Sequence, residues 1–380
     1  MPSIKVAIVH NTIAPYRHPL FERLSETVDL TVYYCSMKHT SRNWDLWPRN
    51  YNYRYKILPR IPIRELSLNP SIVKERALNR PHVLVLGGYV DPTMWLAFAM
   101  SKLLKIPVIY WTEGIKEPKS ILGMITRPLR TLFVKKASAV VVPGKLSRSY
   151  IIGLGADVEK VFIAPNTIDN ELFVEVSRKY QSDKEGLKGQ LGLKGKVVIL
   201  YVGRLVKGKG ITFLFEAYSK LKSQINYIAL VIVGYGKLYN ILRKLCQEKR
   251  INDAIFTGAI VNHRQLIKYY SVADIFVLPT LEDVWGFVIN EAMACGLPIV
   301  ATRASQAARE MIRSGENGYI IKEADSKELY NVLKKLVYNS RLRKKMGEKS
   351  GEIVRREFDV SRMVEGFLSA IKYCTKGMRK

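Results

Sequence analysis

Short apolar runs alternate with longer amphipathic stretches along the first half of the chain. The apolar runs fall at 5–10, 30–35, 82–87, 107–111 and 139–144, and helix-like spacing appears between them, at 16–27 and 92–104. Residues 40–60 are rich in Arg, Asn, Trp and Tyr and predict a loop with an edge strand, YRYKIL. Strands that are apolar on both faces are typical of parallel sheets covered by helices. The pattern therefore predicts an α/β domain with a parallel sheet.

The same alternation returns in the second half. Apolar runs predict strands at 197–203, 227–233, 254–257, 274–278, 299–301 and 318–321, and helical periodicity follows at 326–338, 340–356 and 360–373. A charged, glycine-containing stretch separates the halves, and 380 residues exceed a single ordinary core. We predict an N-terminal domain at 1–175, a linker with a short helix at 176–196, a C-terminal domain at 197–356 and a final helix within 357–380.

The segment DIFVLPTLEDVWGFVINEAMACGLPIVAT, which ends at Thr302, is the most informative one. It predicts a strand at 274–278, a loop at 281–286, a helix at 287–295 that Gly296 closes, and a second strand at 299–302. Two carboxylates, Asp283 and Glu291, then lie near one mouth of this β-α-β unit. Ligands of open parallel sheets bind beyond the carboxyl ends of the strands, so both carboxylates are candidate ligand-binding groups.

This segment resembles the E-x7-E motif of retaining glycosyltransferases of family 4, which have the GT-B fold of two Rossmann-like domains. APNTIDNELF (164–173), YVGRLVKGKG (201–210), VIVGYG, FTGAI and LIKYYSVADIFVLPT follow in the family's order, and VAIVHNTIAPYRHPLF (6–21) matches more loosely. The first acid of the pair is usually Glu. Here it is Asp283, unless Glu282 takes that role with one extra residue between the acids. The resemblance also implies that the last helix crosses back to the N-terminal domain.

The resemblance assigns the diphosphate of a nucleotide sugar to Arg204 and Lys209, which follow the strand at 197–202, with Lys207 as a weaker third. A guanidinium fork and an ammonium group can meet the developing phosphate charge without a metal. We therefore expect a metal-independent enzyme with no cofactor. The plain alternative is two surface cations in a strongly basic protein.

The remaining donor contacts follow in the same way. Glu291 is expected on the ribose hydroxyls, or as an acid that stabilises a helix start, and Asp283 on the hydroxyls of the transferred sugar. Backbone amides at Gly286, Phe287 and Val288 are candidates for contacts to sugar or phosphate. The base-binding edge, for which a plain turn is the alternative, is expected at Gly258, Ile260 and Asn262.

The acceptor side is expected on the N-terminal domain. Asn11, Thr12 and Arg17 follow its first strand and so lie at the predicted ligand cleft between the domains. Glu113 follows the strand at 107–111, where many relatives carry a His that touches the donor sugar. A carboxylate there is expected to orient the sugar or the acceptor hydroxyl, and a solvated loop acid is the alternative.

These features predict a retaining glycosyltransferase that moves a sugar from a UDP- or GDP-linked donor to a hydroxyl of a glycan or lipid-linked acceptor, forming an α-linkage. A phosphorylase and a nucleotide-sugar epimerase are the rival enzymes, although phosphorylases of this fold that use pyridoxal phosphate are far longer. A basic nucleic-acid- or membrane-binding protein with a degenerate GT-B fold is the rival outside enzymes. It leaves Arg204, Lys209 and Glu291 unexplained.

The formal charge of +28 is unusual and spreads over both halves, with 24 basic and 14 acidic residues at 1–175 and 37 and 19 after them. General surface chemistry, nucleic acid and an anionic membrane surface compete as explanations. The stretch KEPKSILGMITRPLRTLFVKK favours a membrane, because basic residues interleave with apolar ones at helical spacing: Lys119, Ile121, Leu122, Ile125, Arg127, Leu129, Arg130, Leu132, Phe133, Lys135 and Lys136. An ordinary helix that packs its apolar stripe on the sheet is the alternative. We expect no nucleic-acid partner.

The remaining composition narrows the class of protein. The four cysteines and five histidines lack metal-ligand spacing, and no apolar run reaches the ~18 residues of a membrane span. We therefore expect a cytoplasmic protein with reduced thiols that is peripheral at the inner face of the membrane.

Overall fold

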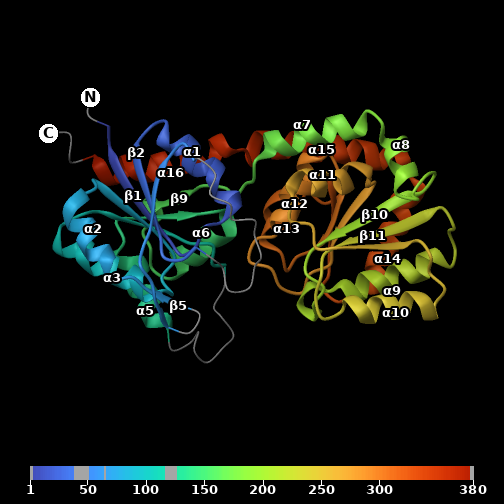
Figure 1. Ribbon diagram of the computed structural model, residues 1–380, viewed down its shortest axis with the longest axis horizontal. Coiled ribbons are helices and arrows are strands. Elements are labelled where there is room, and N and C mark those ends of the chain that lie inside the picture. The colour runs from blue at the N-terminus through green and yellow to red at the C-terminus, as the bar shows by residue number, and fades with distance from the viewer. Residues whose placement is uncertain (1–2, 38–50, 64–65, 116–125, 377–380) are drawn as a thin grey trace. The chain divides into compact units, whose positions relative to one another are not determined.

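Figure 1 shows the computed structural model, which describes residues 3–37, 51–63, 66–115 and 126–376, with the backbone alone at 76–79. The chain divides into two compact units. Unit 1 comprises Met1–Thr167 and Val360–Lys380, and unit 2 comprises Ile168–Asp359. Both are α/β units built on parallel sheets.

The sheet of unit 1 has seven strands in the order β3-β2-β1-β6-β7-β8-β9, all parallel. In that order they are Arg54–Ile57, Asp29–Tyr34, Lys5–His10, Val83–Gly87, Val108–Trp111, Ala139–Val142 and Val161–Ile163. The central strands are buried on both faces, as their continuous apolar sequences predict. The short strand β9 was absent from the sequence prediction.

Helices cover both faces of this sheet. Helix α1 (His18–Ser25), preceded by the 3-10 turn η1 (Pro15–Arg17), and α16 (Val360–Thr375) pack on one face. The other face carries α2 (Ser71–Asn79), α3 (Pro92–Leu103), α5 (Arg127–Lys136) and α6 (Lys145–Gly153). A small hairpin, β4 (Ile61–Ile63) and β5 (Leu66–Leu68), and the turn η2 (Val158–Lys160) complete unit 1.

The last helix returns to unit 1, as the resemblance implies. Helix α16 packs against α1 and against strands β7, β8 and β9. Phe367 is fully buried, with its ring 4.9 Å from that of Trp111. Gly366 permits this approach, because a Cβ there would lie 2.3 Å from the carbonyl oxygen of Ile163.

The sheet of unit 2 has six parallel strands in the order β12-β11-β10-β13-β14-β15. In that order they are Ala254–Gly258, Ile228–Val233, Val197–Val202, Ile275–Leu278, Ile299–Thr302 and Gly318–Ile321. Strand order reverses between β10 and β13, which in doubly wound sheets marks the ligand-binding crevice.

The helices of unit 2 lie on both faces of its sheet (Figure 1). One face carries α7 (Asn170–Gln181), α8 (Lys184–Gln190), α11 (His263–Val272), α12 (Phe287–Ala294), α13 (Gln306–Met311) and α15 (Ser340–Glu357). The other carries α9 (Ile211–Lys222), which the turn η3 (Lys207–Lys209) precedes, α10 (Tyr239–Glu248) and α14 (Ser326–Tyr338). The predicted fold class, two parallel-sheet domains with a returning helix, is confirmed.

The stretch predicted as a linker with a short helix contains such a helix, but it belongs to unit 2. Residues 176–196 form the end of α7, the whole of α8 and the turn before β10, all within unit 2. Val176, Leu187 and Leu193 enter its core, and Lys188 pairs with Asp274 at 2.9 Å. The apolar positions within this charged stretch are widely spaced, so its composition resembles a linker although its periodicity is helical.

Candidate functional site

The predicted phosphate-binding loop follows β10 and is tightly packed at its end. Gly210, which precedes α9, is in the left-handed conformation (φ 63°), and a Cβ there would lie 1.9 Å from the carbonyl oxygen of Pro279. This contact fixes the β10–α9 loop against the loop that follows β13. Arg204 lies at the start of the loop with its side chain exposed, and Lys209 lies at its end, half-buried.

Lys209 and Asp283 form an ion pair across two loops. The Lys209 Nζ is 2.5 Å from Asp283 Oδ2 and 3.5 Å from the carbonyl oxygen of Glu282. Both charged side chains are about one-fifth exposed (18% and 20%), so the pair remains accessible at the carboxyl edge of the sheet. Of the two acids, Asp283 faces the cation, whereas Glu282 is exposed.

Glu291 is half-buried in α12 and lies beside a fully buried tyrosine. The Tyr270 hydroxyl donates a hydrogen bond of 2.6 Å to Glu291 Oε2. Burial raises the pKa of Glu291 to about 7, and the bond from Tyr270 opposes that shift only in part. The site thus holds a carboxyl group that titrates near neutral pH.

The start of α12 is fixed by a small polar cluster. Gly286 has φ 100°, and a Cβ there would lie 2.6 Å from Ser305 Oγ. The Ser305 hydroxyl donates to the carbonyl of Trp285 at 2.5 Å, and the Trp285 indole donates to Asn290 Oδ1 at 2.9 Å. The predicted residues Phe287 and Val288 form the first turn of this helix, at the positive end of its dipole.

The predicted base-binding edge lies beyond β12. Gly258 ends that strand with φ 74°, and its carbonyl accepts from Gly234 N–H at 2.8 Å. Ile260 is half-buried. Asn262 caps α11, since its Oδ1 accepts from Gln265 N–H at 3.2 Å. The capping role accounts for Asn262 without a ligand, so among these residues the backbone is the stronger candidate for base contacts.

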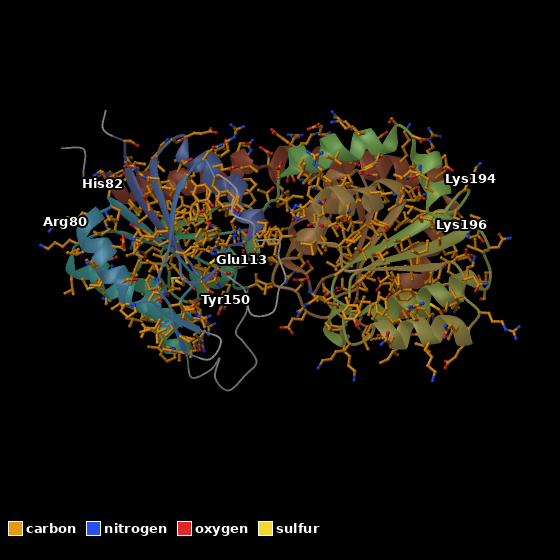
Figure 2. The ribbon with its side chains drawn as sticks, in the orientation of Figure 1. Arg80, His82, Glu113, Tyr150, Lys194 and Lys196 are labelled. Carbon is orange, nitrogen blue, oxygen red and sulfur yellow. The ribbon has the colours of Figure 1, made fainter. Side chains whose placement is uncertain are left out.

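In unit 1 the structure brings together two predicted residues, Arg17 and Glu113, which lie 96 positions apart in the sequence. Their side chains form an ion pair. Glu113, which is labelled in Figure 2, lies two residues after β7. Asn166 Oδ1 accepts from Arg17 at 2.8 Å, and Asn166 Nδ2 donates to Glu113 Oε1 at 2.9 Å. Arg17 is 4% exposed, and its guanidinium lies 4.4 Å from the Trp111 ring centroid. This network fixes the Glu113 carboxylate.

Asn11 and Thr12 follow β1 directly. Asn11 is exposed and Thr12 is buried. The Thr12 carbonyl lies 2.8 Å from Nδ1 of His10, a residue that the sequence prediction missed. Burial, with Arg17 nearby, lowers the pKa of His10 to about 4. The neutral imidazole therefore packs against the aromatic core and is not a charged ligand-binding group.

The basic, apolar surface predicted around 116–136 is partly wrong. Arg130 and Phe133 are buried (4% and 0% exposed), because helical spacing places them on the inner face of α5. Arg130 pairs with the Tyr150 hydroxyl and lies 5.6 Å from the Tyr89 ring centroid. The outer face exposes Arg127, Leu129, Leu132, Lys135 and Lys136. Lys119, Ile121, Leu122 and Ile125 lie outside the described residues.

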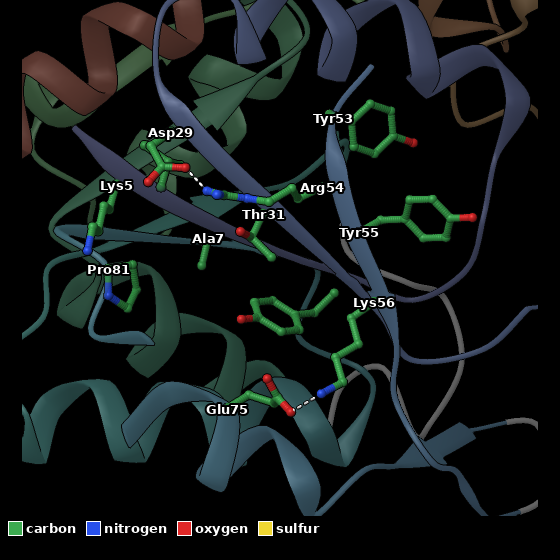
Figure 3. A pocket seen from close by; sticks show the side chains of 12 residues that line it. Lys5, Ala7, Asp29, Thr31, Tyr53, Arg54, Tyr55, Lys56, Glu75 and Pro81 are labelled. Carbon is green, nitrogen blue, oxygen red and sulfur yellow. Dashed lines mark hydrogen bonds and ion pairs between the residues drawn. The ribbon is translucent and has the colours of Figure 1, made fainter. Parts of the chain in front are cut away.

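Unit 1 also contains a cavity of about 620 Å³ that the sequence did not predict. It lies beside β1, β2 and β3 (Figure 3), and two ion pairs, Arg54–Asp29 and Lys56–Glu75, border it. Its lining includes the first residues of these strands. In a parallel sheet that end is opposite to the carboxyl edge where Asn11 and Glu113 lie. Four of the charged residues that line the cavity are paired with each other, and Lys5 adds one positive charge.

Within the described residues, no group of three His, Cys, Asp or Glu side chains is placed to hold a metal ion. No helix of the described ranges is long and apolar enough to cross a bilayer.

In sequence and in fold the chain is similar to known glycosyltransferases. The family model of the glycosyl transferases of group 1 matches residues 183–352, all within unit 2. An uncharacterized glycosyltransferase of Methanocaldococcus jannaschii is 28% identical over 62% of this chain. Alpha-monoglucosyldiacylglycerol synthase of Streptococcus pneumoniae is 29% identical over 55%. The chain spans 58% and 48% of the lengths of these relatives.

The crystal structure of Anabaena HepE in complex with UDP has the same fold. It superposes with a TM-score of 0.79 at 18% sequence identity, over 97% of this chain and 100% of its own. The similarity therefore extends over both units, including unit 1, which the family model does not match.

Proposed function

We propose that this protein transfers a sugar from a nucleotide diphosphate sugar to a hydroxyl acceptor with retention, giving an α-linkage. The observation that carries the proposal is the Lys209–Asp283 pair at the carboxyl edge of the unit 2 sheet. An ammonium group for phosphate and a carboxylate for sugar hydroxyls are adjacent there, at the reversal of strand order. The exposed Arg204 side chain belongs to the same loop as Lys209.

In the proposed reaction the bond between the anomeric carbon and the diphosphate oxygen breaks. The acceptor oxygen bonds to that carbon on the same face of the sugar, and the acceptor proton passes to the departing phosphate. Arg204 and Lys209 stabilise the charge that develops on the diphosphate. Asp283 holds the sugar hydroxyls, and it is already engaged with Lys209, which disfavours a role as nucleophile.

The other roles follow from position. Glu291 accepts hydrogen bonds from the ribose hydroxyls, and the first turn of α12 lies beside the sugar and phosphate. The backbone at Gly258 and Ile260 contacts the base. In unit 1 the Glu113 carboxylate, fixed by Arg17 and Asn166, orients the sugar or the acceptor hydroxyl.

A screen of UDP- and GDP-linked sugars for donor hydrolysis and transfer tests this function. We expect release of the nucleoside diphosphate from one donor, and an α-configured product by NMR. A β-configured product from an α-linked donor contradicts retention. Conversion of the donor into another nucleotide sugar, with no diphosphate released, identifies an epimerase instead.

We further propose that the acceptor is carried on a lipid or glycan at an anionic membrane, with the outer face of α5 as the contact surface. That face exposes Leu129 and Leu132 (48% and 46%) beside Arg127, Lys135 and Lys136. Exposed leucines flanked by cations favour insertion at a charged interface. The relative named as a diacylglycerol glycoside synthase supports a lipid acceptor.

Charge reversal on this face is expected to weaken vesicle binding. Each basic residue near an anionic surface contributes about 1 kcal/mol, so Arg127→Glu, Lys135→Glu and Lys136→Glu together should reduce binding to phosphatidylserine-containing vesicles at least ~100-fold at low salt. The same changes should lower transfer to a lipid acceptor and leave donor hydrolysis in solution intact. Vesicle sedimentation over a salt series measures the effect.

A matched control exists in unit 2, where Arg341, Lys344 and Lys345 are exposed on α15. Reversal of these three charges changes the net charge by the same amount as reversal on the α5 face, but it should weaken vesicle binding less. Equal losses in both triple variants would show that net charge, not the α5 face, governs binding.

Nucleotide binding is also expected to strengthen as pH rises through neutrality. Because burial raises the pKa of Glu291 to about 7, the free protein holds this carboxyl group protonated at lower pH. The ribose hydroxyls donate to the ionised form, so affinity should fall up to about tenfold for each pH unit below 7. Calorimetry with UDP and GDP from about pH 5.5 to 8 measures this dependence.

The Glu291→Gln variant is the control for this pH dependence, since titration of the nucleotide phosphate is common to both proteins. We expect its profile to be flatter than that of the wild type. Parallel profiles would remove Glu291 from the ribose site.

A further inference from the structure

Tyr235 is a large aromatic residue that unit 2 exposes at its ligand-binding edge. It directly follows β11 in the sequence Gly-Tyr-Gly, and 60% of its surface is exposed. A tyrosine ring that is exposed in a short loop adds no buried apolar surface to the hydrophobic core. The surrounding backbone shows that this loop is nevertheless tightly packed.

Both neighbouring glycines are required by close backbone contacts. A Cβ on Gly234, which has φ 144°, would lie 1.9 Å from the carbonyl oxygen of Gly203, and one on Gly236 would lie 2.5 Å from that of Leu205. Leu205 N–H donates to the Tyr235 carbonyl at 3.1 Å. The main chain of Tyr235 is thus fixed while its side chain extends into solvent.

The order of the strands places this ring between two predicted contact regions. Strand β11 lies between β10, which Arg204 follows, and β12, which ends at Gly258. Gly234 N–H donates to the Gly258 carbonyl at 2.8 Å, which joins the two loops. A nucleotide with its diphosphate at Arg204 and its base near Gly258 therefore extends across the end of β11.

Other aromatic rings support Tyr235 from α10. Its ring centroid is 5.0 Å from that of Tyr239, which in turn is 5.7 Å from Phe256 in an edge-to-face arrangement. Tyr239 and Phe256 pack on the core of unit 2. The array is a supported aromatic surface at a sheet edge, and such surfaces bind nucleobases by stacking whatever the base.

We propose that Tyr235 is a donor-binding residue that stacks on the nucleobase of the nucleotide sugar. This inference rests on the proposed nucleotide-sugar function and adds a side chain to a subsite otherwise assigned to backbone atoms. Since stacking contributes to donor binding and not to the bond that breaks, Tyr235 acts on KM and leaves kcat nearly unchanged.

Calorimetry with UDP, GDP and pyrophosphate, which has no base, tests this proposal on four proteins. These are the wild type, Tyr235→Ala, Tyr235→Phe and Tyr338→Ala, where Tyr338 is equally exposed (59%) at the end of α14. We expect Tyr235→Ala to weaken binding of the preferred nucleotide about 5- to 100-fold and to leave pyrophosphate binding unchanged. Tyr235→Phe and Tyr338→Ala should bind like the wild type.

The outcomes separate this proposal from the function on which it rests. If the wild type binds UDP or GDP and Tyr235→Ala binds it equally well, the stacking role is wrong and the proposed function stands. Equal weakening of pyrophosphate binding would also overturn it, since the defect would then lie in the phosphate loop. A wild type that binds neither nucleotide overturns both proposals.

Discussion

Replacement of Arg204 or Lys209 by alanine is expected to lower turnover by about 10²–10³-fold, the usual loss when one preorganised charge partner of a transition state is removed. Both residues lie in the loop after β10, and Gly210 fixes the end of that loop against Pro279. Because charge grows on the diphosphate as the glycosidic bond breaks, the effect should appear mainly in kcat. Steady-state kinetics at saturating donor measures it.

The Arg204→Ala and Lys209→Ala variants differ in whether a neighbouring carboxylate loses its ion-pair partner. Lys209→Ala removes the partner of a half-buried carboxylate, Asp283, so part of its effect belongs to that acid. Arg204 is exposed, and its removal leaves no carboxylate without its ion-pair partner. Arg204→Ala is therefore the cleaner test. Lys194 lies just before the amino end of the same strand (Figure 2), and Lys194→Ala is the matched control. Near-wild-type turnover in both Arg204→Ala and Lys209→Ala would contradict the phosphate assignment.

Substitution of the two acids of the β13–α12 segment, Asp283 and Glu291, is expected to give large but different defects. Glu291→Gln is expected to weaken binding of free UDP or GDP about 10- to 100-fold, the loss for hydrogen bonds to a charged group. Asp283→Asn should leave free nucleotide binding unchanged and lower sugar transfer about 10²-fold or more. The reason is that Glu291 meets the ribose whereas Asp283 meets the transferred sugar.

Both substitutions preserve side-chain size, so each serves as the control for the other. Calorimetry with the free nucleotide, followed by transfer assays with the intact donor, gives both readouts on one pair of proteins. If Asp283→Asn weakened binding of the free nucleotide and Glu291→Gln left that binding unchanged, the two roles would have to be exchanged.

The sequence predicted the strands well because buried parallel strands are continuous apolar runs. β1 and β15 match their predicted bounds, and β6 and β10 differ by one residue. Helices α7 and α8 were less visible, since their buried positions are interspersed with charges. The short strand β9 has three residues, too few for a periodic signal.

Most of the site features that the sequence did not predict are contacts between residues far apart in the chain. Asn166 lies within the quoted stretch APNTIDNELF, so its motif was visible, but its bonds to Arg17 and Glu113 join positions 149 and 53 residues away. Arg130 was predicted on the surface as one of the cations that interleave with apolar residues at 116–136, yet Tyr89 and Tyr150 contact it. Tyr235 lies in the quoted stretch VIVGYG but belongs to no periodic pattern. Only the fold shows that its ring is exposed.

The most direct test of the nucleotide-sugar site is protection from thermal unfolding. A ligand that binds only the folded state stabilises it by about 2.7 kcal/mol at 100 times its Kd. We predict that UDP or GDP raises the melting temperature of the wild type, that Arg204→Ala reduces this shift, and that a single-stranded oligonucleotide produces none. Protection by the oligonucleotide, with no response to either nucleoside diphosphate, would contradict the glycosyltransferase account and favour a basic nucleic-acid-binding protein.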